Sequence, residues 1–346
     1  MNERRWELDI IRIIACAMVV VIHVAGYGME IMNPETWNWQ VRNLVVSMTK
    51  CTVPIFFMMS GALFLNREIS IKQLYKKYIS HILILWIVWS SFYAVIDYVA
   101  YIKNGETSIV FFLERFFLGH YHLWFLPSLL AAYIMYPLLY KMAHTLDKNH
   151  ILYLGVIVLF GIVFKETLDP FLMSPIWDGI WNDLAVPGGF VGVVYFVLGY
   201  YLDKKVDILP ARLWIIIYGC AVLVIAGINQ GCSLYCKEPL SITYGYLSFG
   251  VMISAVAIFS FLIQKIRSVR LKAMQMNIIK EISGCTLGIY LMHTFFIEQV
   301  FRRIGLMQEN YPVIVSIILF STLSFGISLL LTWCIRRIPI LRKWIV

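Results

Sequence analysis

After Asp9 at its start, one apolar stretch near the beginning of the chain, DIIRIIACAMVVVIHVAG (residues 9–26), contains an arginine and a histidine, whose types suit anion binding and proton transfer. Arg12 and His23 are eleven residues apart. At about 100° per residue, eleven residues complete three helical turns and roughly 20° more, so both side chains share one face, about 16 Å apart along the axis. Histidine is the commonest general base near neutral pH. The spacing therefore predicts a helix that carries a base some distance from a cation.

Each of these residues also has a structural interpretation. Asp9 lies one turn before Arg12 and can pair with it, and an arginine near the end of a membrane helix can extend its side chain to the interface. His23 lies deeper, where an ionisable side chain is costly unless it faces a cavity or a partner. His23 is therefore either a general base or a buried hydrogen-bonding residue.

Further polar residues in apolar stretches are candidates for the same site. Lys50 lies early in a second apolar stretch and is either a site residue or an interfacial lysine. The segment GHYHLWFLPSLLAAY (residues 119–133) places His122 and Trp124 at the start of another stretch, where an aromatic belt alone accounts for the tryptophan. The segment GIYLMHTFFIEQ (residues 288–299) adds His293, for which a structural hydrogen-bonding role is favoured.

The composition identifies a polytopic membrane protein. Of 346 residues, 60% are hydrophobic and 14% are charged, whereas a soluble protein has about 25% charged residues. The apolar runs are continuous rather than alternating, which favours helices over a β-barrel. We predict an all-α chain with a single integral-membrane domain over residues 1–346 and a first helix that is retained. The net charge of +9 then belongs to loops at a membrane surface, so nucleic acid is not expected as a partner.

About ten stretches are predicted to span the membrane. They cover residues 8–27, 44–65, 78–102, 121–142, 151–166, 184–202, 212–229, 244–265, 284–302 and 312–335. Residues 106–119 instead predict an amphipathic helix at the membrane interface.

The distribution of lysine and arginine predicts the orientation of these spans. With the N-terminus inside, the inner segments are rich in basic residues, among them Arg4, Arg5, Lys76, Lys77, Lys204, Lys205, Arg267, Arg270, Arg336, Arg337, Arg342 and Lys343. Both termini are therefore expected in the cytoplasm. Cys232 and Cys236 would then share an outer loop, NQGCSLYCKEP, where they form either a disulfide or two free thiols.

The sequence lacks the motifs of several common enzyme classes. The chain has no G-x-S-x-G, H-E-x-x-H or Walker motif. No dense cluster of carboxylates predicts a metal site, and two cysteines without a neighbouring ligand do not predict zinc.

Five segments, taken in order, resemble the acyltransferase family 3 of membrane O-acyltransferases. They are LDIIRIIACAMVVVIH with Asp9, Arg12 and His23 in register, then PIFFMMSGALFL, the basic segment YKKYISH, HLWFLPSLL and GIYLMHTFF. The resemblance covers nearly the whole chain and is closest to the branch of surface-polysaccharide O-acetyltransferases. The chain departs from the family in the basic segment, where Lys76, Lys77 and His81 stand in place of the usual arginines.

The resemblance implies transfer of an acyl group, most simply acetyl, from cytoplasmic acyl-CoA to a hydroxyl of a cell-surface glycan. Acetyl-CoA is then a co-substrate, and no cofactor is permanently bound. The protein is expected in the bacterial cytoplasmic membrane, and a homo-oligomer is compatible with this function. His23 would be the general base, with Asp9 holding Arg12. The implied substrate-binding residues are Lys76, Lys77, Lys50, His122, Trp124 and His293.

Two other functions fit ten helices with buried polar groups. A transporter or flippase of a polysaccharide or lipid-linked precursor fits equally well, although the chain lacks the internal repeat typical of transporters. If the protein is instead a structural subunit of a polysaccharide synthase, replacing His23 by alanine should have no effect on chemistry.

Overall fold

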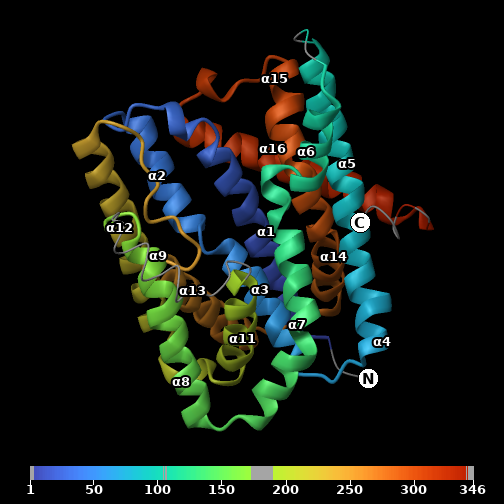
Figure 1. Cartoon of the computed structure of the whole chain (residues 1–346), viewed down its shortest axis with the longest axis vertical. Coiled ribbons are helices and arrows are strands. Elements are labelled where there is room, and N and C mark those ends of the chain that lie inside the picture. Colours follow the sequence, from blue (N-terminus) through green and yellow to red (C-terminus); the bar gives the residue numbers. More distant parts are fainter. Residues whose placement is uncertain (1–3, 104, 106, 173–189, 340, 342–346) are drawn as a thin grey trace.

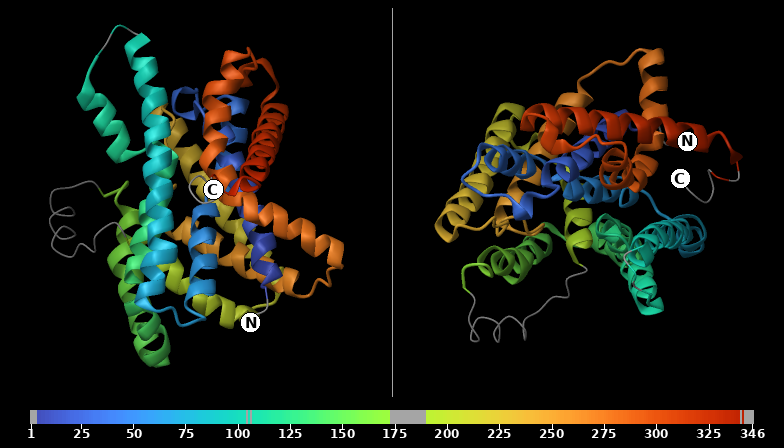
Figure 2. Two further views of the ribbon diagram at one scale, coloured as in Figure 1. Left: turned by 90° about the vertical axis from the view of Figure 1, so that its right-hand side faces the viewer. Right: turned by 90° about the horizontal axis from the view of Figure 1, so that it is seen from above.

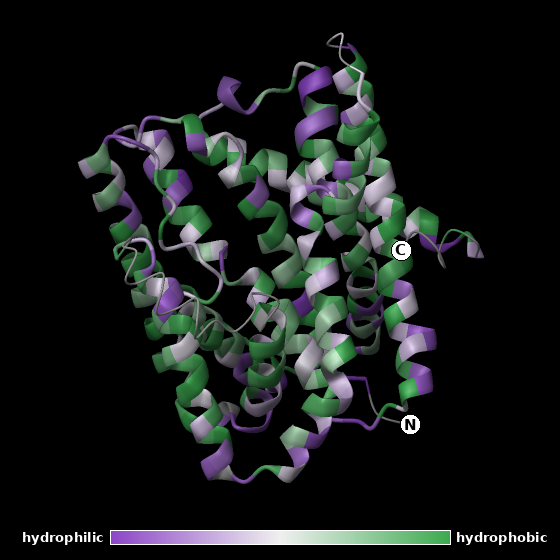
Figure 3. Cartoon of the chain, in the orientation of Figure 1, coloured by the Kyte–Doolittle hydropathy of each residue, from purple (hydrophilic) through white to green (hydrophobic). Residues whose placement is uncertain are grey.

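The computed structural model describes residues 4–103, 105, 107–172, 190–339 and 341, and this part of the chain consists of helices joined by turns, without a strand. Eight helical segments within it are long and apolar enough to cross a membrane. Apolar residues cover most of the helices, and hydrophilic residues gather toward the two ends of the molecule (Figure 3). The predicted all-α membrane fold is confirmed, while the side on which each terminus lies and the single domain remain predictions.

Each predicted span coincides with a helix or with consecutive helical segments. In chain order these are α1 (Trp6–Gly26); α2 (Trp37–Thr49) with α3 (Thr52–Phe64); α4 (Ile71–Gln73) with η2 (Leu74–Ile79) and α5 (Ser80–Lys103); η3 (Tyr121–Trp124) with α7 (Phe125–Thr145); α8 (Lys148–Val158) with η4 (Leu159–Phe164) and α9 (Lys165–Leu168); α11 (Phe190–Lys204); α12 (Ala211–Cys236); α13 (Phe249–Arg267); α14 (Ala273–Phe295) with η6 (Phe296–Val300) and α15 (Phe301–Arg303); and α16 (Val313–Arg336).

Two of these helices are not among the eight apolar segments, and some predicted residues lie outside the described ranges. Helix α11 has 15 residues. The start of the predicted span 184–202 lies outside the described ranges, as do Arg342 and Lys343. Helix α14 carries several buried polar residues. The amphipathic segment forms helix α6 (Ile109–Leu118), which has no buried residue and folds back against α5 (Figures 1 and 2).

Helix α1 lies at the centre of the bundle and contacts α14, α2, α16, α3 and α13. Its largely apolar sequence buries residues such as Ile11, Val19 and Val20 among these neighbours. The last carbonyls of a helix have no partner within the helix. Here the buried Arg42 of α2 donates hydrogen bonds to the carbonyls of Val24 and Ala25, at 3.0 Å each. This contact fixes the end of α1 immediately after His23.

The second span is broken rather than continuous. Helix α2 ends at Thr49 and α3 begins at Thr52, and Pro54 lies in the first turn of α3, where a missing N–H group costs little. Lys50 occupies the break between the two helices. The position of this lysine is therefore set by an irregular piece of backbone and not by a helix face.

Helices α3 and α11 touch through glycine, which allows their backbones to approach closely. A methyl group on Gly61 would collide with the backbone of Phe196, and one on Gly199 would collide with the backbone of Met58. Both glycines are therefore required for the distance between these two helices.

The prediction of a loop around Cys232 and Cys236 is wrong. Helix α12 continues to Cys236, seven residues beyond the predicted end, and both cysteines are free thiols. The extension persists because its polar residues bind the following segment. Asn229 accepts a hydrogen bond from the backbone of Thr243 at 3.1 Å, and Ser233 accepts one from Leu240 at 2.9 Å.

Candidate functional site

Three cavities lie along α1, and two of them meet at His23. The first, here called the His23 cavity, has a volume of about 420 Å³. The second, the Glu298 cavity, has a volume of about 840 Å³ and shares His23 and Tyr121 with the first. The third, the Arg12 cavity, has a volume of about 340 Å³. The His23 and Arg12 cavities have four lining residues in common: Val19, Val53, Phe125 and Tyr290. The lining is therefore shared between the cavity that contains Arg12 and the cavity that contains His23.

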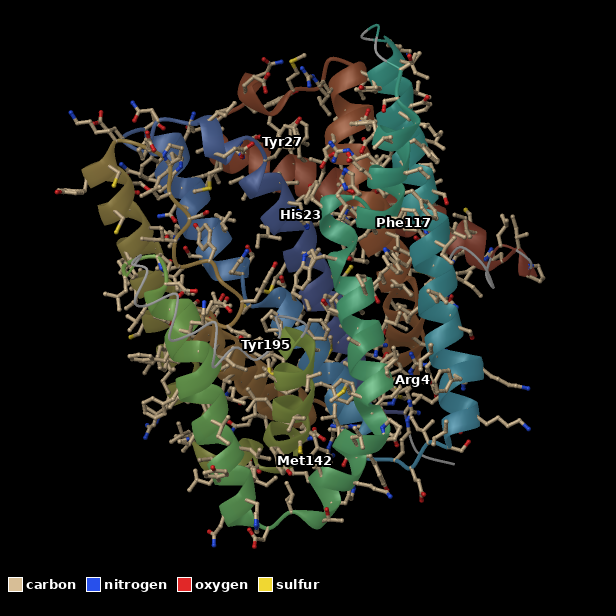
Figure 4. All side chains as sticks on the ribbon, viewed as in Figure 1. Arg4, His23, Tyr27, Phe117, Met142 and Tyr195 are labelled. Carbon is tan, nitrogen blue, oxygen red and sulfur yellow. The ribbon has the colours of Figure 1, made fainter. Side chains whose placement is uncertain are left out.

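His23 lies on the last turn of α1, and its ring nitrogens have no hydrogen-bond partner among the described residues. Figure 4 shows His23 one turn before Tyr27, whereas Arg4 lies toward the end of the molecule that holds the N-terminus. The imidazole of His23 is half-buried and lines the cavity. Because it makes no hydrogen bond to the described protein, it is free to bind a ligand.

Two further histidines surround His23. The ring centroid of His293 lies 4.9 Å from that of His23, and the ring of His122 lies 6.3 Å away. His293 is fully buried, and its Nδ1 is 2.7 Å from the carbonyl oxygen of Tyr290, so that nitrogen carries the proton. No group of residues suited to holding a metal ion occurs in the described part of the chain.

Glu298 and His120 extend the cluster away from His23. The Nε2 atom of His120 lies 3.3 Å from a carboxylate oxygen of Glu298, and the hydroxyl of Tyr121 donates to the other oxygen at 2.7 Å. The Nδ1 atoms of His120 and His122 are 2.8 Å apart. Tyr290 donates a hydrogen bond to the backbone carbonyl of His122. The segment η3 is therefore held between the Glu298 cavity and the His23 cavity.

Lys50 and Trp124 line the His23 cavity together with two tyrosines. The ammonium of Lys50 lies 4.4 Å from the ring centroid of Tyr246 and 5.6 Å from that of Tyr244. The ring of Trp124 is 4.9 Å from that of Tyr246. Lys50 forms no direct ion pair with a described residue, and its nearest charge contacts are these aromatic rings, so the ammonium is available to a ligand in the cavity.

The structure places Arg12 in its own cavity and holds it loosely. Its guanidinium lies 3.4 Å from both Asp9 and Ser283, and 31% of its side chain is exposed. Asp9 makes shorter contacts, at 2.6 Å, with Arg4 and with the hydroxyl of Ser283. Asp9 therefore joins Arg4, α1 and α14, and Arg12 keeps donors that face the cavity.

Lys76 and Lys77 do not line any of the three cavities. They are exposed on η2, whose neighbouring residues Tyr78 and His81 do line the Arg12 cavity. Helix α4, which leads into η2, lies at the same end of the molecule as the N-terminus (Figures 1 and 2). The two lysines are thus surface groups beside that cavity.

A salt-bridge network closes the same end of the bundle. Asp203 of α11 accepts hydrogen bonds from Arg5 at 2.6 and 2.7 Å and from Arg267 of α13. The hydrogen bond to Asp203 raises the pKa of Arg5. The network ties the start of α1 to two neighbouring helices.

Of the predicted site residues, the structure brings His23, Lys50, His122 and Trp124 to one cavity, with His293 in ring contact with His23. The sequence drew attention to His120 and Glu298 as polar residues in apolar stretches but gave them no role, and it did not single out Tyr121 or Ser283 as site residues. His293 and Glu298 are five residues apart, which in a regular α-helix places them on different faces. The wider π-turn of η6 allows both to approach the histidine cluster, and the sequence contains no clear signal for that turn.

Comparison with known proteins shows the family to which the chain belongs. A family model described as an acyltransferase domain matches residues 5–335. The chain is similar to proteins named "Probable poly-beta-1,6-N-acetyl-D-glucosamine export protein" from Staphylococcus aureus. The protein of strain MRSA252 is 23% identical over 96% of this chain and 94% of the relative, and that of strain Mu50 is 22% identical over the same shares. No solved structure matches the chain.

The family match covers almost every described helix, from the start of α1 to the end of α16. It includes the segments that carry the histidine cluster and all three cavities. The protein therefore belongs to acyltransferase family 3 and is a multi-pass membrane acyltransferase.

Proposed function

We propose that the protein is an O-acyltransferase of the bacterial cytoplasmic membrane that moves an acetyl group from cytoplasmic acetyl-CoA to a hydroxyl of a cell-surface glycan. The observation that supports the proposal is the position of His23. It lies where the His23 and Glu298 cavities meet, and the lining of the His23 cavity continues into the Arg12 cavity. A base in this place can meet a donor from one end of α1 and an acceptor from the other.

The donor enters from the end of the molecule that carries Arg12. Coenzyme A bears several phosphate charges, and Arg12 offers a partly exposed guanidinium that is only loosely bound to Asp9. Lys76 and Lys77 lie on the nearby surface and meet the nucleotide there. The long, thin pantetheine arm then follows the shared lining residues toward His23, over a distance of about 16 Å.

The acyl transfer itself uses acid–base chemistry. His23 takes the proton from the acceptor hydroxyl as the hydroxyl oxygen attacks the thioester carbonyl. The carbon–sulfur bond then breaks, and the proton passes from His23 to the sulfur, which leaves an ester on the glycan and free coenzyme A. The ammonium of Lys50 stabilises the negative charge that develops on the carbonyl oxygen, and Trp124, His122 and His293 shape the pocket around the reacting groups.

The names of the relatives favour a second function, the export of a polysaccharide. An exporter needs a passage through which a glycan moves from one side of the membrane to the other. It needs neither acyl-CoA nor a base at position 23. Acyl transfer therefore requires acyl-CoA and His23, whereas export requires neither.

A single preparation tests the two functions. The purified protein in lipid nanodiscs is incubated with radiolabelled acetyl-CoA and β-1,6-linked N-acetylglucosamine oligomers, and the same protein in sealed vesicles is assayed for movement of the oligomers. Acyl transfer predicts a labelled, alkali-sensitive ester on the glycan that is lost in His23→Ala. Movement of oligomers without acyl-CoA, unchanged in His23→Ala and without ester formation, would contradict the proposal and favour export.

A further inference from the structure

A chain of three side chains joins the Glu298 cavity to the His23 cavity. Glu298 and His120 line the former, and His122 lines the latter. The contacts run from the carboxylate of Glu298 to Nε2 of His120 at 3.3 Å, and from Nδ1 of His120 to Nδ1 of His122 at 2.8 Å. Within this chain the carboxylate is the one group that can only accept hydrogen bonds.

The carboxylate determines where the protons of a neutral His120 lie. Because Glu298 only accepts, Nε2 of His120 carries the proton, and Nδ1 of His120 has a lone pair. That lone pair accepts a hydrogen bond from Nδ1 of His122. His122 is then the tautomer whose Nε2 atom has the free lone pair.

The protein does not satisfy this lone pair well. The nearest hydroxyl is that of Thr294, whose oxygen lies 3.5 Å from Nε2 of His122. Tyr93 donates its own proton to the carbonyl of Leu291 at 2.8 Å. It therefore accepts the proton of Thr294 across their 2.9 Å contact. This leaves Nε2 of His122, whose ring lines the His23 cavity, without a short hydrogen bond from the protein.

We propose that the acceptor presents two neighbouring hydroxyl groups, of which His23 activates one while His122 accepts a hydrogen bond from the other. The ring centroids of His23 and His122 lie 6.3 Å apart, and both rings line the same cavity. A pair of hydroxyl oxygens about 2.8 Å apart, each about 2.8 Å from a ring nitrogen, spans such a gap. Glu298 and His120 are positioning residues that keep His122 in the accepting tautomer. The inference rests on the proposed acyl transfer and adds that the acceptor sugar reacts as a diol.

The substitution Glu298→Gln tests this assignment with little change of shape. The amide oxygen still accepts from Tyr121, but the amide nitrogen now donates to Nε2 of His120. The protons along the chain shift, and Nε2 of His122 becomes a donor. Kcat/KM for a diol-bearing sugar is expected to fall about fivefold to a hundredfold, the range for a buried hydrogen-bonding group that is left without its partner.

The matched substrate is the same sugar with the second hydroxyl replaced by hydrogen. This deoxy sugar already lacks the contact with His122, so Glu298→Gln should change its kcat/KM by less than about threefold. In the wild-type protein, kcat/KM for the diol should exceed that for the deoxy sugar by the same factor by which Glu298→Gln lowers kcat/KM for the diol. A substitution of the exposed carboxylate Glu114, Glu114→Gln, serves as the control and should alter neither substrate. Equal losses for the diol and the deoxy sugar would overturn the proposal.

Equilibrium binding of the two sugars, measured without acyl-CoA, separates this inference from the proposed function. A tenfold or larger preference in binding for the diol, lost in Glu298→Gln, would support the diol site. If the wild-type protein binds in this way but transfers no acyl group, only the proposed acyl transfer is refuted. Equal binding of the two sugars by folded wild-type protein would overturn the diol site. If Glu298→Gln fails to fold, His122→Gln replaces it in the same comparison.

Discussion

At the residue scale, the site depends on side chains that the protein leaves wholly or partly without partners. His23 has free ring nitrogens, Lys50 forms no direct ion pair, and Arg12 is only loosely bound to Asp9. Such groups are costly within a membrane protein. Their retention at three points along one connected lining is explained most simply by a substrate that contacts all three.

Arg12 is expected to contribute more to donor binding than the surface lysines. In Arg12→Ala the KM for acetyl-CoA should rise about tenfold to a hundredfold, since a charge-assisted contact to phosphate is lost, while kcat changes less. The double variant Lys76→Ala/Lys77→Ala should raise the same KM by a smaller factor that shrinks at high salt, because both side chains are exposed. Steady-state kinetics over a range of salt concentrations measure both. An unchanged donor KM in Arg12→Ala would rule out its role.

The candidate residues could be found in the sequence because ionisable side chains are rare in apolar stretches. His23, Lys50, His122 and His293 stand out in this way, and the structure brings them together. His120 and Glu298 stand out in the same way, but their contacts with one another and with His122 could not be found by this reasoning. The approach of Glu298 depends on the π-turn of η6, and the contact between His120 and His122 depends on the short helix η3.

At the element scale, the site is held by helix ends and breaks rather than by regular helix. Arg42 binds the terminal carbonyls of α1, and the break between α2 and α3 places Lys50. The apolar spans were predictable because length and hydrophobicity alone define them. The extension of α12 was not, since it depends on polar contacts with the segment that follows the helix.

The contact between α3 and α11 is expected to tolerate no side chain at Gly61. In Gly61→Ala the added methyl group meets the backbone of Phe196, so the free energy of unfolding should fall by about 1–3 kcal/mol or more. A methyl group on Gly227 of α12 would meet no atom within 4 Å, and Gly227→Ala should be neutral or stabilise by about 0.5–1 kcal/mol. Thermal unfolding in detergent compares the two variants. Equal stability would show that the helices can separate without cost.

At the scale of the whole molecule, the account requires that the Arg12 end faces the cytoplasm. The basic inner segments predict this orientation, with both termini inside. Labelling of single cysteines with a membrane-impermeant reagent in intact cells should therefore leave a cysteine at Lys77 unmodified and modify one at Tyr235, which is exposed near the end of α12. The reverse pattern would place the donor cavity on the wrong side for acyl-CoA.

The most direct test of the central claim is single-turnover acyl transfer by wild-type protein and His23→Ala, both purified and shown to be folded. With saturating acetyl-CoA and glycan acceptor, the rate of ester formation should fall by about 10² to 10⁴ in the variant, the usual loss when a general base is removed. The thermal stability should change little, because the ring of His23 makes no hydrogen bond to the described protein. Folded His23→Ala protein that transfers acetyl groups at close to the wild-type rate would contradict the account.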